Sequence, residues 1–151
     1  MPIASIEEIQ AKVGEEVGVS GWILIDQARI DQFAEVTEDH QFIHVDPQAA
    51  AATPFGGTIA HGFLSLSLLS RMAEDAMLRP EAIKMGVNYG FEKVRFLAPV
   101  RSGKRVRGRF RLNRFDEKRP GQFQFVHEVT VEIEGEDKPA LTADWIGLIF
   151  V

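Results

Sequence analysis

The feature that most constrains this fold is a strict alternation of charged and apolar residues in the carboxyl-terminal half of the chain. Residues 105–112 carry arginine at every second position, and residues 123–133 continue the alternation. Because successive side chains of a β-strand point to opposite faces, this pattern predicts long strands with one buried face. Residues 87–97 and 141–151 predict two further strands. Turn residues separate these runs, so we expect an antiparallel meander, with turns at 99–103, 117–121 and 135–137.

The segment before these strands predicts one unusually apolar helix, at about residues 61–77. A helix that is apolar nearly all the way round has to be enclosed by other elements. A long antiparallel sheet wrapped around one helix satisfies both patterns, which predicts an α+β architecture of the hot-dog type. The apolar residues of this helix are Phe63, Leu64, Leu66, Leu68, Leu69 and Met72.

The amino-terminal third predicts shorter elements followed by a long irregular segment. Ser5 and Glu8 form a capping box that starts a first helix, residues 17–25 are typical of a strand, and Asp26 is expected to cap a helix that continues to residue 36. Residues 37–57 show no sustained period apart from one short helix at 47–52. Loops of this length inside compact domains are uncommon and are often functional.

Composition narrows the class of protein. A chain of 151 residues that is 45% hydrophobic fits one domain, residues 1–151. The net charge of -5 argues against nucleic-acid binding, which depends on clustered positive charge. The absence of cysteine suits a reducing compartment, no targeting segment is visible, and residues 62–69 are too few to span a membrane, so we expect a cytoplasmic protein.

Three short segments carry a family resemblance: DHQFIH at 39–44, PFGGTIAHG at 54–62, and NYG at 88–90. Together they resemble the MaoC-like dehydratases, the family of the R-specific enoyl-CoA hydratases and the nodulation protein N-like proteins. The resemblance extends from the strand at residue 17 to the carboxyl terminus.

The resemblance implies that the protein hydrates trans-2-enoyl thioesters to R-3-hydroxyacyl thioesters, or catalyses the reverse dehydration, with no metal and no cofactor. It implies that Asp39 and His44 hold the water and that Ser70 orients the aspartate. The acyl group would be carried by coenzyme A or by acyl carrier protein. It also implies a homodimer joined edge to edge, which would cover the edge strands that a lone sheet exposes.

The usual motif of the family reads Gly-Asp-x-Asn-Pro-x-His, and this chain departs from it at three positions. Glu38, Gln41 and Phe42 replace the glycine, asparagine and proline. Gln41 can present the same amide group, whereas Phe42 removes the backbone angle that proline imposes. We expect these changes to affect the substrate more than the chemistry.

Addition of water to an enoyl thioester requires a base at the β-carbon, a proton at the α-carbon and stabilisation of charge on the thioester oxygen. A carboxylate and an imidazole are suitable acid–base groups, which assigns Asp39 and His44 to the water. Gly62 begins the apolar helix, where unpaired N–H groups carry partial positive charge, so its backbone is the predicted donor to the oxygen.

Several other residues have both a functional and a structural interpretation. His61 could contact substrate or simply cap the helix, Asn88 and Tyr89 could line the acyl pocket or merely begin a strand, and His127 fits a packed core. Arg101, Lys104 and Arg105 could bind coenzyme A phosphates or lie on a solvated face. No pair of histidines has the helical spacing of a metal site. The predicted substrate contacts are Gln41, Gly57, His61, Asn88 and Tyr89.

Two other functions remain open at the level of sequence. A hot-dog thioesterase would cleave the thioester instead of hydrating the double bond. A non-catalytic acyl-thioester-binding module would keep the fold and pocket without turnover, and the changes at Gln41 and Phe42 leave room for it.

Overall fold

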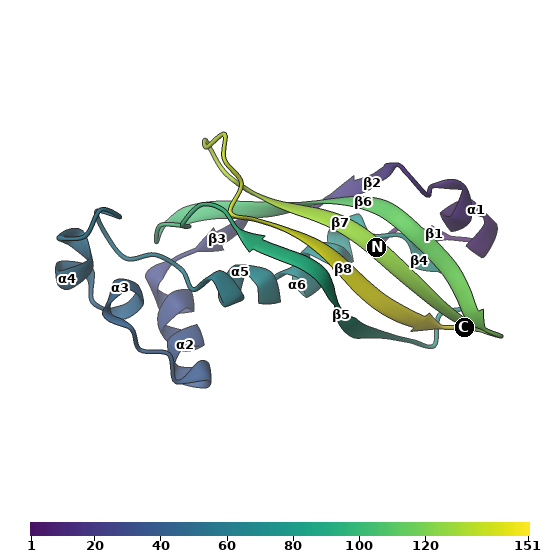
Figure 1. The fold of residues 1–151 in the computed structure, drawn as a ribbon, viewed down its shortest axis with the longest axis horizontal. Coiled ribbons are helices and arrows are strands. Elements are labelled where there is room, and N and C mark those ends of the chain that lie inside the picture. Colours follow the sequence, from purple (N-terminus) through teal and green to yellow (C-terminus); the bar gives the residue numbers. More distant parts are fainter.

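The computed structural model describes residues 1–151 and consists of a long curved antiparallel sheet packed on one helical rod, with a group of small helices beyond one end of the sheet (Figure 1). This arrangement confirms the predicted α+β, hot-dog architecture. The order across the main sheet is β2-β6-β7-β8-β5, and β3 also pairs with β6. The strands are β2 (Glu16–Val19), β3 (Ile23–Ile25), β5 (Met85–Phe96), β6 (Lys104–Arg119), β7 (Gln122–Ile133) and β8 (Leu141–Phe150), and β1 (Ile3–Ala4) pairs separately with β4 (Arg79–Pro80).

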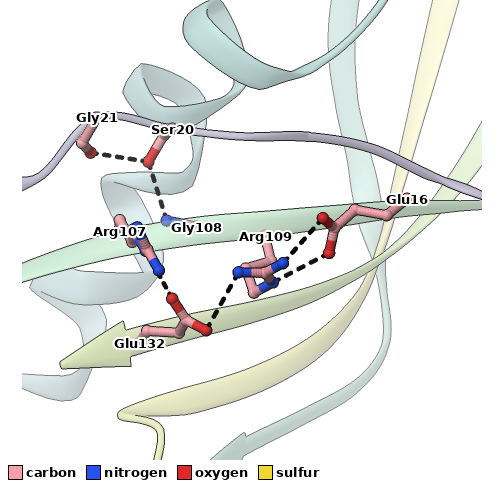
Figure 2. Close-up of polar contacts among 7 residues, drawn as sticks. All are labelled: Glu16, Ser20, Gly21, Arg107, Gly108, Arg109 and Glu132. Carbon is pink, nitrogen blue, oxygen red and sulfur yellow. Dashed lines mark hydrogen bonds and ion pairs between the residues drawn. The ribbon is translucent and has the colours of Figure 1, made fainter. Parts of the chain in front are cut away.

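The alternation in β6 and β7 sorts side chains as predicted. Inward-facing residues such as Phe110 and Val129 are fully buried. The outer face carries a ladder of ion pairs, in which Arg107 contacts Glu132 at 2.6 Å and Arg109 contacts Glu16 at 2.9 Å (Figure 2). Exposed ion pairs of this kind contribute little stability, so burial of the inner face holds the sheet on the helix.

The prediction of one continuous strand over residues 17–25 is wrong, because the chain bends at Ser20. The Ser20 N–H donates to the Gly108 carbonyl, and the Ser20 hydroxyl oxygen accepts from the Gly108 N–H, both at 2.9 Å (Figure 2). A side-chain oxygen thus takes the place of a strand carbonyl. The Gly21 N–H then donates to Asp75 on the central helix at 3.2 Å.

The central helical rod consists of α5 (Gly62–Ser67) and α6 (Leu69–Ala76), joined through Leu68 in helical conformation. The predicted helix at 61–77 is therefore confirmed within one residue at either end. The prediction that its whole circumference is enclosed is wrong at Phe63, which is 66% exposed. The fully enclosed part lies further along, where Leu69 and Met72 face the sheet.

The amino-terminal helices follow their capping residues. The capping box of Ser5 starts α1 (Ile6–Ala11), and Asp26 accepts a hydrogen bond at the start of α2 (Gln27–Thr37). The short helix α4 (Pro47–Ala51) was also predicted, but α3 (Phe42–Val45) was not, because no side chain caps it. These three helices, α2, α3 and α4, lie beyond one end of the sheet (Figure 1). None of the helices is long and apolar enough to cross a membrane.

Two details of the strand connections differ from the expected meander. The turn predicted over 117–121 is tighter, because β6 runs to Arg119 and only Pro120 and Gly121 connect it to β7; Gly121 has a φ of 73°. The strand β5 pairs with β8 and not with β6, its neighbour in sequence. It therefore forms one edge of the sheet, and this edge exposes Met85, Val87, Tyr89, Phe91 and Phe96.

Candidate active site

Asp39 and His44 lie close together at the end of the sheet nearest the small helices. A carboxylate oxygen of Asp39 and ring nitrogens of His44 and His61 all lie within 4.8 Å of one another. The chain reverses at Glu38, which closes α2 with a left-handed backbone at φ 60° and ψ 21°. Glycine adopts this conformation easily, so Glu38 occupies a strained position where the family motif has glycine.

The side chain of His44 is buried, and its protonation pattern follows from its neighbours. Its Nδ1 lies 2.7 Å from the Ile59 carbonyl oxygen, which can only accept a hydrogen bond. In neutral His44 the proton therefore sits on Nδ1, and Nε2 carries a free lone pair. Burial lowers the pKa of His44, and the nearby His61 lowers it further, against opposing effects of Ile59 and Asp39. The result is a neutral imidazole suited to act as a base.

His61 connects the two predicted catalytic residues. Its ring stacks on that of His44 with centroids 3.8 Å apart, and its Nε2 donates to the Asp39 main-chain oxygen at 2.9 Å. The same nitrogen lies 3.9 Å from the Asp39 carboxylate, while Nδ1 is buried with no hydrogen-bond partner. Because His61 is only 3% exposed, it acts within the site more as a support than as an open substrate contact.

Gly62 lies in the same cleft, directly after His61 at the first turn of α5. The cleft has a volume of about 250 Å³ and includes His44, Ser65 and Phe96 in its lining. A Cβ atom at position 62 would lie only 2.8 Å from the Phe96 ring, so the close approach requires glycine. The first N–H groups of a helix have no intrahelical acceptor, which leaves this backbone available to an oxygen in the cleft.

Two residues that sequence reasoning missed hold the site in place. The Gln27 side chain donates to the His44 main-chain oxygen at 2.7 Å and accepts a hydrogen bond from the Thr58 hydroxyl. Ile59 accepts from His44, and its N–H donates to the Ile43 carbonyl at 3.0 Å. A polar residue in the first turn of α2 could have suggested Gln27, but a main-chain role such as that of Ile59 leaves no trace in residue type.

Other predicted site residues lie elsewhere. Gln41 is exposed, and only its main-chain N–H contacts Asp39, at 3.3 Å. Gly57 is outside the cleft lining, and Tyr89 is 66% exposed on the sheet edge. Ser70 is eight residues after Gly62, about 12 Å further along the helix, and lines a second cavity together with Asn88.

The remaining alternatives from the sequence also have an outcome. Lys104 contacts Glu136 at 3.3 Å and Arg105 pairs with Glu134, so both are on the ion-paired outer face of the sheet. The cluster of Asp39, His44 and His61 has the proximity of a metal site. Sequence spacing could not indicate it, because the three residues come from separate segments. A metal ion would have to displace the bond from His61 to the Asp39 carbonyl.

Comparison with known sequences places this geometry among relatives. A family model described as a MaoC like domain matches residues 8–136. Nodulation protein N of Rhizobium meliloti (strain 1021) is 54% identical over 145 residues, which cover 95% of this chain and 90% of that protein. The 3-hydroxyacyl-thioester dehydratase Z of Mycobacterium tuberculosis is 46% identical over 142 residues, which cover 94% of this chain and 93% of that protein.

Solved structures show the same fold at low sequence identity. A monoamine oxidase regulatory protein from Archaeoglobus superposes with a TM-score of 0.80 at 23% identity, covering 99% of this chain and 96% of that one. An (R)-hydratase from A. caviae superposes with a TM-score of 0.67 at 24% identity, covering 87% of this chain and 95% of that one.

Proposed function

Because this chain belongs to the MaoC-like dehydratase family, we propose that it is an R-specific enoyl-thioester hydratase. It adds water across the 2,3 double bond of trans-2-enoyl thioesters of coenzyme A or acyl carrier protein, or removes water from the R-3-hydroxyacyl product. The observation that carries the proposal is the convergence of Asp39 and His44 beside Gly62. The dehydratase relative at 46% identity supports an acyl-thioester substrate.

The proposed reaction uses each of these groups at a stated atom. Two hydrogen bonds of about 2.8 Å through one water span a gap of about 4.5–5 Å, which matches the separation of at most 4.8 Å between Asp39 and His44. His44 Nε2 takes one proton from this water while its oxygen bonds to C3. The electrons of the double bond move to the thioester oxygen, where the Gly62 N–H stabilises the enolate. The protonated His44 then returns the proton to C2.

The first test is hydration of crotonyl-CoA, followed by loss of the enoyl absorbance. We expect Asp39→Asn and His44→Gln each to lower kcat by at least about 10², with folding intact by circular dichroism. His40→Gln is the matched control, because His40 is exposed and adjacent to Asp39. Full activity in either site variant would contradict the assignment.

The same reaction mixture separates the two other functions. Release of free thiol without hydration would indicate a thioesterase. Saturable binding of crotonyl-CoA without either product would indicate a non-catalytic acyl-binding module, for which the exposed, unengaged side chain of Gln41 is the motivating feature.

We further propose a homodimer of single-domain copies, each spanning residues 1–151, that pair edge to edge through β5. The exposed apolar residues Val87 and Phe91 on this edge support it. Antiparallel pairing reverses the direction of the second central helix, so Ser70 of the partner subunit would approach the Asp39 end of the first copy. Sedimentation of Phe91→Arg as a monomer would support this interface, and an unchanged molecular mass would oppose it.

A further inference from the structure

A second cavity of about 270 Å³ lies between α6 and the inner face of the sheet. Its walls are mainly apolar and include Ala73, Met77, Trp145 and Ile149. It shares no lining residue with the cleft at His44. Its volume is close to the lower end of small-molecule sites, about 300 Å³, so it has room for a short chain rather than for water alone.

One polar side chain stands out in this apolar wall. His127 lies on the inward face of β7, only 4% exposed, between the edges of Phe125 at 4.9 Å and Phe110 at 6.2 Å between ring centroids. Its Nδ1 has no hydrogen-bond partner. Burial lowers the pKa of His127 to about 3, so the ring is a neutral donor and acceptor at physiological pH. The proposed hydration does not use it.

The neighbouring inward positions of β7 indicate what packing alone would select. Val129 and Val131 are apolar and fully buried on the same face. A buried polar group without a partner destabilises the folded state, and such groups are rare unless a ligand or water satisfies them. An imidazole at this position is therefore better explained by recognition than by packing.

We propose that this cavity binds an alkyl or acyl chain that carries one hydrogen-bonding oxygen, a hydroxyl or keto group, which pairs with the imidazole of His127. The apolar walls take the carbon chain. The neutral ring can donate to a keto oxygen and can donate to or accept from a hydroxyl.

Two probes of equal shape isolate this hydrogen bond: 2-octanone, and 2-methyl-1-octene, in which a CH₂ group replaces the keto oxygen. Fluorescence of Trp145, which lines the cavity, reports binding once the other tryptophan is removed by Trp22→Phe. The measured quantity is the ratio of the two dissociation constants, because comparing this ratio between variants cancels the difference in hydrophobicity between the probes.

We expect His127→Leu to shift this ratio by about tenfold against 2-octanone. His40→Leu, which removes an exposed histidine, is the control and should leave the ratio unchanged. In the unsubstituted chain, the imidazole ¹⁵N resonances of His127 should move with 2-octanone and less with the alkene, a readout that needs no variant at this position. Absence of binding by both probes, or an unchanged ratio in His127→Leu, would overturn the proposal.

A last measurement identifies the source of the chain, and it rests on the proposed function. If the occupant is the acyl chain of the substrate, 2-octanone raises the KM for crotonyl-CoA hydration. If the occupant is a separate ligand, the KM stays constant while Trp145 reports binding; either result supports the site. If the protein does not hydrate crotonyl-CoA, the hydratase proposal fails, while the fluorescence experiment still decides the cavity.

Discussion

Replacing His127 by leucine should make the protein less sensitive to acid. The pKa of His127 is about 3 in the folded chain, compared with 6.5 for an unperturbed histidine. Between these two values the unfolded chain binds a proton that the folded chain rejects, so stability falls as pH decreases from 6.5 towards 3 and is unaffected above 6.5. At pH 5.0 this difference amounts to about 2 kcal/mol, and at pH 7.5 it is close to zero.

Urea unfolding at pH 7.5 and pH 5.0, at one fixed protein concentration, measures the effect. The acid-induced loss of unfolding free energy should be about 2 kcal/mol smaller in His127→Leu than in the unsubstituted protein. The comparison cancels the other groups that titrate in this range, His44 among them. Equal losses in the two proteins would refute the argument that His127 is buried in its neutral form. His40→Leu should leave the pH dependence of stability unchanged.

Three further outcomes follow from the site and the fold. Because the pKa of His44 is lowered, kcat/KM for crotonyl-CoA should be constant above about pH 7 and fall only below pH 6.5; an acid limb above pH 7 would contradict a neutral base. Gly62→Ala should reduce kcat at least about tenfold without unfolding, because its Cβ meets the Phe96 ring at 2.8 Å. Gly18→Ala should destabilise the fold by about 2 kcal/mol in urea unfolding, because its Cβ would lie 2.3 Å from the Ala76 carbonyl oxygen; unchanged stability would oppose this packing argument.

The elements with strong local signals were predictable from the sequence. The alternation in β6 and the capping residues Ser5 and Asp26 each depend on neighbours within a few positions, and the structure places them as expected. The break at Ser20 was not predictable, because it depends on a hydrogen bond to Gly108, 88 residues away. The pairing of β5 with β8 is likewise a long-range contact that periodicity does not encode.

The site shows the same division. Asp39 and His44 were predicted from a motif, and the structure brings them together, although their catalytic roles stay predictions. The support from His61 was missed, because stacking between residues 17 positions apart has no sequence pattern. Ser70 was assigned by resemblance alone, and within one chain the helix carries it away from Asp39.

The bond from His44 to the carbonyl of Ile59 has a consequence for reversibility. Protonation adds a hydrogen to Nε2 and leaves the Nδ1 bond unchanged, so the ring keeps its place whether or not it is charged. Acid should therefore silence the base without displacing it. Activity should return as soon as the proton leaves, with no slow refolding phase, because the main chain and not the substrate holds the ring in register.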